Sequence, residues 1–154
     1  MDSAEDLADD LPTRDRIPII NQIKKQFPKF FVTEVTNDDL TFSPEKDNGF
    51  IEYKRKLDIC TKDREEKYAT QMVWRINQNI KSYAVYFIGL DDDGTIIGIS
   101  PCDIIDCIQK FASVAQSVNA SIIDIQIINV KQSIIIKISP KIKKARSNFL
   151  VDFC

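Results

Sequence analysis

The side chains that could do chemistry in this chain are carboxylates, lysines and cysteines, because its 154 residues contain no histidine. Without an imidazole there can be no Ser-His-Asp or Cys-His pair, so catalysis would need carboxylates, lysines or a metal ion held by oxygen ligands. The clearest grouping of such side chains is Glu52, Lys54 and Lys56, which alternate along one stretch. In a strand they would share one face, where the lysines could hold phosphates beside the carboxylate. A solvated strand face with cross-strand ion pairs is the competing interpretation.

The cysteines favour a structural role. The four of them form no C-x-x-C pair, and a zinc site would need all four at spacings that match no common zinc motif: Cys60, Cys102, Cys107 and Cys154. We therefore expect free thiols in a reducing compartment. No apolar run reads as a signal peptide or reaches membrane-spanning length, so we expect a cytoplasmic protein with no membrane partner. The net charge of -2 gives no global attraction to nucleic acid, although a local basic patch is compatible with it.

Composition shifts predict four regions along the chain. Residues 1–16 are an acidic tail that we expect to be disordered, and residues 17–48 form a short helix, ending near Pro28, followed by an irregular lead-in. Residues 49–140 carry the α+β domain. Residues 141–154 read as a basic linker opened by Pro140 and a further strand.

Hydrophobic periodicity predicts the elements of that domain. Strands are expected over 50–57, 82–90, 95–99, 121–129 and 133–139, with a hairpin turn at Asp91-Asp92-Asp93-Gly94. One helix should run from a cap at Thr61 or Asp63 to about residue 79, and a second should begin at Pro101 with Ser100 as its cap. The order β-α-β-β-α-β-β predicts a mainly antiparallel sheet with two helices packed on it.

Three stretches carry a resemblance to a known family: NGFIEYKRKL, YATQMVWRINQ and AVYFIGLDDDGTIIGIS. Together they resemble the N-terminal domain of the GTP-binding protein 1 and 2 family of translational GTPases, relatives of elongation factor 1-alpha. The resemblance covers roughly residues 44–140, and its most specific element is T-Q-M-x-W-R, formed by Thr70, Gln71, Met72, Trp74 and Arg75. We expect Trp74 to pack in the core or at a domain interface.

The resemblance implies an accessory domain that positions a GTPase on the ribosome, on RNA or on a partner factor in translation or mRNA surveillance. In the family, a segment like NFLVDFC leads into the phosphate-binding loop, yet these 154 residues contain no G-x-x-x-x-G-K-[ST]. We therefore expect no catalysis and no cofactor in this chain, with GTP and magnesium belonging to a downstream domain if one is present. The GTPase domain would act in cis or in trans, and no small-molecule substrate is evident.

Contact with RNA would use cations that attract phosphates. The residues that we expect to make it are Lys54, Lys56, Arg75, Lys143, Lys144 and Arg146.

Two alternatives remain open from the sequence. A more distant resemblance to schlafen-type and AlbA-type domains implies a metal-dependent RNA endonuclease, in which Asp47, Glu52 and Asp92 would hold magnesium or manganese. Asp47 stands where that family usually has a glutamate, which shortens the reach by one methylene. The other alternative is a protein-binding scaffold, in which Trp74 and the apolar residues 149–153 dock onto a separate GTPase.

Overall fold

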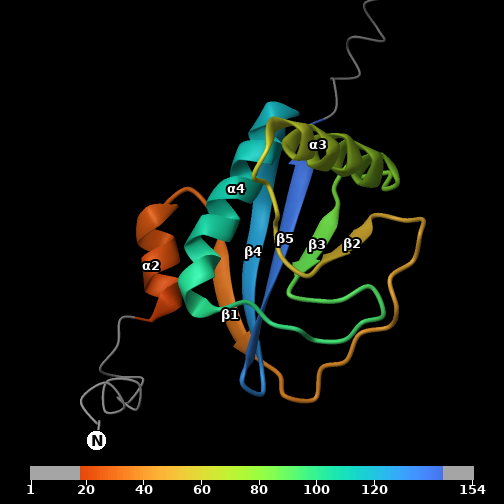
Figure 1. Cartoon of the computed structure of the whole chain (residues 1–154). Coiled ribbons are helices and arrows are strands. Elements are labelled where there is room, and N and C mark those ends of the chain that lie inside the picture. The colour runs from red at the N-terminus through yellow and green to blue at the C-terminus, as the bar shows by residue number, and fades with distance from the viewer. Residues whose placement is uncertain (1–17, 144–154) are drawn as a thin grey trace, which may run out of the picture.

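A computed structural model describes residues 18–143 (Figure 1). Its elements are, in order, α2 (Ile19–Gln26), β1 (Val32–Thr36), β2 (Ile51–Lys54), α3 (Lys62–Asn77), β3 (Val85–Ile88), the short 3₁₀ helix η2 (Pro101–Asp103), α4 (Ile104–Ser117), β4 (Ala120–Val130) and β5 (Ser133–Ile142). The five strands form one open sheet in the order β1-β4-β5-β3-β2. The predicted α+β class is confirmed.

The sheet is mixed rather than mainly antiparallel. β4 pairs antiparallel with β5, and β5 pairs antiparallel with β3. The two outer pairs, β1 with β4 and β2 with β3, are parallel. β2 and β3 are connected through α3, a crossover that brings the chain back in the same direction, whereas β2, α3, β3 and α4 all lie between β1 and β4 along the chain.

Both faces of the sheet carry apolar residues. The helices cover one face, where Ile23, Met72, Ile76 and Phe111 pack on alternate residues of the central strands. The other face holds a smaller cluster that includes Tyr53, Ile128 and Ile135. It is covered by loop residues, among them Leu40 and Phe42. Burial on two sides explains why β4 and β5 are apolar along much of their length instead of strictly alternating.

The structure changes two strand assignments. The lead-in predicted to be irregular contains β1, which pairs with residues more than ninety positions further along the chain. The predicted strand over 95–99 is wrong: the segment makes one isolated bridge, between Leu90 and Ile96, and a few separate backbone hydrogen bonds, two of them to the carbonyl of Gly89, but no continuous ladder. Gly98 has a φ of 85°, which takes the chain out of the extended conformation there. The hairpin turn itself is confirmed by the 2.9 Å bond from Gly94 N to Asp91 O.

The helix boundaries follow the sequence closely. α2 ends two residues before Pro28, and α3 begins after Thr61, whose hydroxyl accepts from the backbone N–H of Arg64 at 3.2 Å. The second long helix begins as a 3₁₀ turn at Pro101. Ser100 makes no side-chain cap bond; its hydroxyl lies 3.2 Å from the sulfur of Cys102 instead.

The last hairpin is longer than predicted. β5 runs through Pro140 to Ile142, so Pro140 does not open a linker. A register shift between Ile122 and Asp124 interrupts the ladder and leaves Ile123 exposed, whereas Ile125 and Ile127 are buried as expected. Residues 1–16, Lys144, Arg146 and residues 149–153 lie outside the described part of the chain.

Candidate functional site

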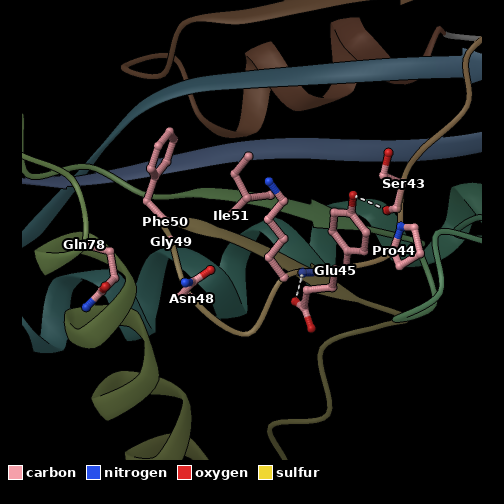
Figure 2. A pocket seen from close by; sticks show the side chains of 10 residues that line it. Ser43, Pro44, Glu45, Asn48, Gly49, Phe50, Ile51 and Gln78 are labelled. Carbon is pink, nitrogen blue, oxygen red and sulfur yellow. Dashed lines mark hydrogen bonds between the residues drawn. The ribbon is translucent and has the colours of Figure 1, made fainter.

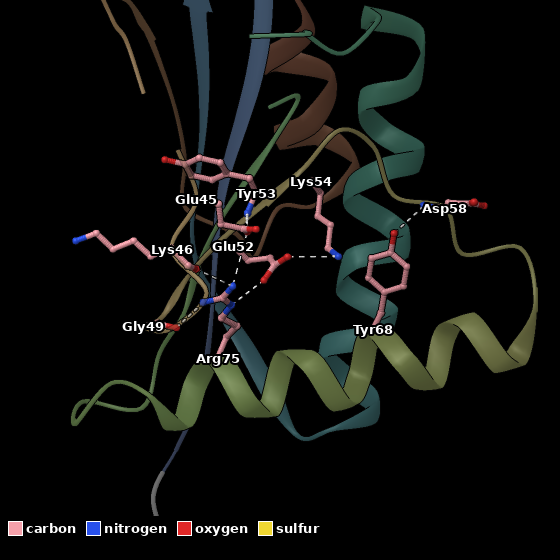
Figure 3. A network of polar contacts seen from close by, with 9 residues as sticks. All are labelled: Glu45, Lys46, Gly49, Glu52, Tyr53, Lys54, Asp58, Tyr68 and Arg75. Atoms are coloured by element: carbon pink, nitrogen blue, oxygen red, sulfur yellow. Dashed lines mark hydrogen bonds and ion pairs between the residues drawn. The ribbon is translucent and has the colours of Figure 1, made fainter. Parts of the chain in front are cut away.

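A buried ion pair joins β2 to α3 (Figure 3). The Nε of Arg75 donates to Glu52 at 2.7 Å, and each of the two side chains keeps only 5% of its surface exposed. The other guanidinium nitrogens donate to the carbonyls of Gly49 at 2.8 Å and Lys46 at 3.3 Å. A second carboxylate, that of Glu45, lies 3.7 Å from Nη2. The guanidinium is thus fully engaged inside the protein.

This burial corrects two predictions. The solvated strand face that was one interpretation for Glu52 is not observed, because that face lies under α3 and Glu52 is buried. Arg75 was expected to contact RNA, but its buried head cannot reach a phosphate at the surface. The pattern of alternating residues was right that Glu52 and Lys54 share a face, although it extended the strand to Lys56, which lies beyond the end of β2. It could not show that the polar face is the covered one, because Arg75 lies 23 residues further along.

Lys54 sits between the buried pair and the solvent. Its Nζ lies 3.4 Å from Glu52 and 4.8 Å from the centre of the Tyr68 ring. Tyr68 is held in turn, because its hydroxyl oxygen accepts from the backbone N–H of Asp58 at 3.2 Å. These contacts fix the lysine head while 22% of its side chain remains exposed.

The predicted RNA-contact residues are not brought together. Lys56 and Lys143 are exposed, and Lys144 and Arg146 lie beyond the described residues. Lys54 of β2 pairs with Ile88 of β3, which in turn pairs with Ile136 of β5, so Lys54 and Ile136 lie at the same height in the sheet. Lys143 lies seven residues further along, roughly 23 Å away at about 3.3 Å per residue. The two ends of the sheet therefore carry separate positive charges.

The predicted carboxylate triad does not form a shared site. Asp47 and Asp92 are exposed, whereas Glu52 is buried and paired with Arg75. Asp92 contacts this region through its backbone only: its carbonyl accepts a hydrogen bond from the backbone N–H of Glu45 at 2.7 Å. Across residues 18–143, no three carboxylate or thiol side chains are grouped so that they could hold a metal ion. The geometry gives the nuclease hypothesis no support.

A hollow of about 560 Å³ runs along the outer edge of β2 (Figure 2). The loop of residues 43–49 forms one wall, and Ile51 and Tyr53 form the other. Glu45 projects beside it and accepts the outward N–H of Tyr53 at 2.6 Å. Burial raises the pKa of Glu45, although this hydrogen bond and Arg75 act in the opposite direction. Sequence reasoning missed Glu45, because no local pattern marks a loop carboxylate that caps a distant strand edge.

Trp74 is not a core residue. It keeps 44% of its surface exposed on the outer side of α3, and the Arg75 guanidinium carbon lies 5.1 Å from its ring centre. Shallow hollows flank it on both sides. The prediction of core packing is wrong, and the prediction of an interface remains open.

The fold and the site define an α+β domain with a buried ion-pair network beneath one helix and separate clusters of cations at the two ends of its sheet. No helix in the described part of the chain is long and apolar enough to cross a membrane.

Comparison with known proteins gives the family. The chain is 44% identical over 130 residues to the uncharacterized protein R625 of Acanthamoeba polyphaga mimivirus, a match that covers 84% of this chain and 70% of that protein. The chain belongs to the same family as R625. No family model matches it, and neither does any solved structure.

A second similarity covers about half of the chain. GTP-binding protein 2 of human and of mouse is 35% identical over 79 residues, which are 51% of this chain and 13% of those proteins. The similarity therefore relates part of this domain to a small segment of a much longer GTP-binding protein.

Proposed function

We propose that this chain is an accessory domain of a GTP-binding protein system, which positions a GTPase on RNA or the ribosome. The observation that carries the proposal is the similarity to GTP-binding protein 2, which is confined to 13% of that protein's length. A shared segment of that size has the dimensions of a domain rather than of a whole enzyme. The proposal includes the expectation that this domain corresponds to the N-terminal domain of the GTP-binding protein 1 and 2 family.

The charges of the domain support a contact with RNA. Near the end of β2, Lys54 and Lys56 lie beside Arg55, and Lys143 follows β5 at the other end of the sheet. Lys144 and Arg146 extend that second group along the sequence. Cations that neutralise phosphates supply most of the sequence-independent affinity for nucleic acids. Arg75 is not among the residues that we now expect to contact RNA, because its charge is neutralised by Glu52 inside the domain.

The test is co-sedimentation of the purified chain with ribosomes over a series of salt concentrations. We expect binding at low salt that weakens as salt rises, and weaker binding for the Lys56→Gln/Lys143→Gln variant. The matched control is Lys24→Gln/Lys25→Gln, which removes two exposed cations from the last turn of α2. Ribosomes that fail to retain the chain at low salt would contradict the RNA part of the proposal.

The relation to a GTPase needs its own measurement. The protein to use is a variant of GTP-binding protein 2 that lacks the segment matched by this chain. Adding the chain to this variant should increase the amount of the variant that sediments with ribosomes. Recovery that is the same with and without the chain would exclude action in trans.

A further inference from the structure

A small hollow of about 200 Å³ lies between the end of β2 and the first half of α3. Its lining is Lys54, Arg64, Lys67, Tyr68 and Gln71. Every lining residue ends in a polar group, three of them are cations, and none is acidic. Pockets for whole organic ligands usually measure about 300–1,000 Å³, so this one suits a smaller group.

We propose that this hollow binds one backbone phosphate of a single-stranded RNA and that the adjacent base stacks on Trp74. The inference rests on the proposed function, for which it names the ligand and the site.

The helix spacing creates the site. Arg64, Lys67, Tyr68 and Gln71 follow one another at intervals of three, one and three residues, which places them on one side of α3. Lys54 reaches the same place from β2, because the strand ends beneath the helix.

The cations are held before a ligand arrives. Arg64 donates through Nε to the carbonyl of Asp58 at 3.0 Å, and its Nη2 lies 3.1 Å from the carboxylate of the same residue. Lys54 is fixed between Glu52 and the Tyr68 ring. Cations whose heads are already positioned lose less entropy when they bind an anion.

Neutral donors complete the lining. The hydroxyl oxygen of Tyr68 accepts from Asp58 N, which leaves its own proton to donate into the hollow. Gln71, one turn further along the same side of α3, adds a side-chain amide that can donate. Charged and neutral donors that converge on one point are the usual partners of phosphate oxygens.

The charge balance favours an anion. Glu52 is matched by Arg75, and Asp58 is matched by Arg64. Lys67 has no ion-pair partner in the described part of the chain, so it adds a positive charge that is not neutralised. Of the three acidic residues of the same helix, Asp63 and Glu66 line a neighbouring hollow and Glu65 lines neither of the two.

Trp74 extends the site from a phosphate to a nucleotide. The hollow beside Trp74 shares Lys67 and Gln71 with the cationic hollow, so the two are contiguous. The exposed ring is supported from one side by Arg75. Stacking of a base on an aromatic ring is tolerant of sequence and accompanies backbone contacts in proteins that bind single strands.

The experiment measures fluorescence anisotropy of a labelled single-stranded RNA of about ten nucleotides, a length within the usual range of site sizes. We expect Arg64→Gln/Lys67→Gln to weaken binding about tenfold and to make the salt dependence shallower by about 0.7 in log-log slope, since the hollow holds one phosphate and each phosphate contact contributes about 0.7. Trp74→Ala should weaken binding at least about fivefold, with little change in that slope. The control is Lys24→Gln/Lys25→Gln, which should retain the affinity of the wild type.

Competition distinguishes the source of the phosphate. Unlabelled single-stranded RNA should displace the probe at far lower concentration than inorganic phosphate or a nucleoside monophosphate. Displacement by the monophosphate at an equal concentration would assign the hollow to a free nucleotide and contradict the RNA site.

The outcomes separate this inference from the proposed function. RNA binding that both site variants retain at the control's level would overturn the site and leave the proposed function standing. No RNA binding at low salt would remove the RNA part of both. The melting temperature of each variant should match the wild type; if Arg64→Gln unfolds the domain, Lys67→Glu alone carries the test, because Lys67 has an exposed side chain.

Discussion

Arg75 and Glu52 meet at 2.7 Å inside the domain, where they attach an edge strand to the helix that covers it. Arg75 also holds the two carbonyls that precede β2 in the chain, those of Lys46 and Gly49. One side chain therefore fixes the strand, its lead-in loop and the helix relative to one another. The cationic hollow lies one helical turn away on the same two elements, so its geometry depends on this pair.

Breaking this pair should destabilise the domain strongly. Arg75→Met takes the closest partner from the buried Glu52 carboxylate and leaves it only the Lys54 head at 3.4 Å, so we expect the free energy of unfolding to fall by about 3–5 kcal/mol. Chemical denaturation measures it. Arg64→Gln, which removes an exposed pair with Asp58, should cost no more than about 1 kcal/mol. Similar losses for the two variants would mean that burial does not set the strength of the inner pair.

The turn before Thr95 should not accept a side chain at Gly94. Gly94 has a φ of 92°, and a Cβ there would collide with the backbone carbonyl of Phe42. We expect Gly94→Ala to lower the free energy of unfolding by about 2–4 kcal/mol, from backbone strain and collision together. Gly49 has the same φ, but a Cβ would meet nothing within 4 Å. Gly49→Ala should therefore cost only about 1–2 kcal/mol, and an equal cost for both would contradict the predicted collision.

The hydroxyl of Tyr86 should be dispensable for folding. It is buried and has no hydrogen-bond partner among the described residues, and burial raises the pKa of this side chain. Tyr86→Phe removes the unsatisfied oxygen and keeps the edge-to-face contact with Phe111. We expect the free energy of unfolding to stay level or to rise by about 1 kcal/mol. A loss of 1 kcal/mol or more in thermal or chemical denaturation would show that the hydroxyl has a partner.

Glu45 should make stability depend on pH. Because burial raises the pKa of Glu45 above its ordinary value of 4.5, the folded domain binds this proton more tightly than the unfolded chain does. The stabilisation is present below pH 4.5 and is lost as the pH rises through the raised pKa, so this contribution to the free energy of unfolding falls as the pH increases from 4.5. Glu45→Gln removes the titration. The free energy of unfolding of the wild type, relative to that of Glu45→Gln, should therefore fall as the pH rises. A difference that stays constant with pH in chemical denaturation would contradict this prediction.

The three described cysteines should differ in reactivity. Cys60 and Cys102 are exposed, whereas Cys107 is buried in α4 and burial raises the pKa of its thiol to about 12. A thiol reagent at neutral pH should modify the first two in the native domain, while Cys107 reacts only when the domain unfolds. Mass spectrometry after timed labelling, with a denatured sample as the control, measures each site. Labelling of native Cys107 as fast as that of Cys60 would contradict its burial.

The local elements were predictable because they depend on local patterns. Met72 and Ile76 of α3 recur every four residues, and the cap at Thr61 adds a second signal. The class of fold followed from the order of these elements. β1 was missed because Val32 is its one buried residue, so an exposed and mostly polar strand shows little alternation. Its partner β4 lies far away in the sequence, and no local signal encodes that pairing.

The candidate site was harder to predict than the fold. The sequence drew attention to Glu52, Lys54 and Arg75 but placed all three at the surface, whereas Glu52 and Arg75 are buried. Which face of a strand is covered depends on where a helix packs, and a charged residue can be buried when its counter-ion comes with that helix. Trp74 shows the converse, since a large apolar residue lies exposed on the outer side of the helix that buries Arg75.

The carboxylate of Glu45 also bears on how copies of this domain meet. β2 ends the sheet, and an uncapped terminal strand offers a row of donors and acceptors to any extended segment from another molecule. Glu45 occupies the Tyr53 donor in the middle of that row and places a negative charge in the path of an incoming backbone. A single loop residue thereby opposes the pairing of this edge strand with a strand of another molecule. It should therefore limit aggregation through this edge at high protein concentration.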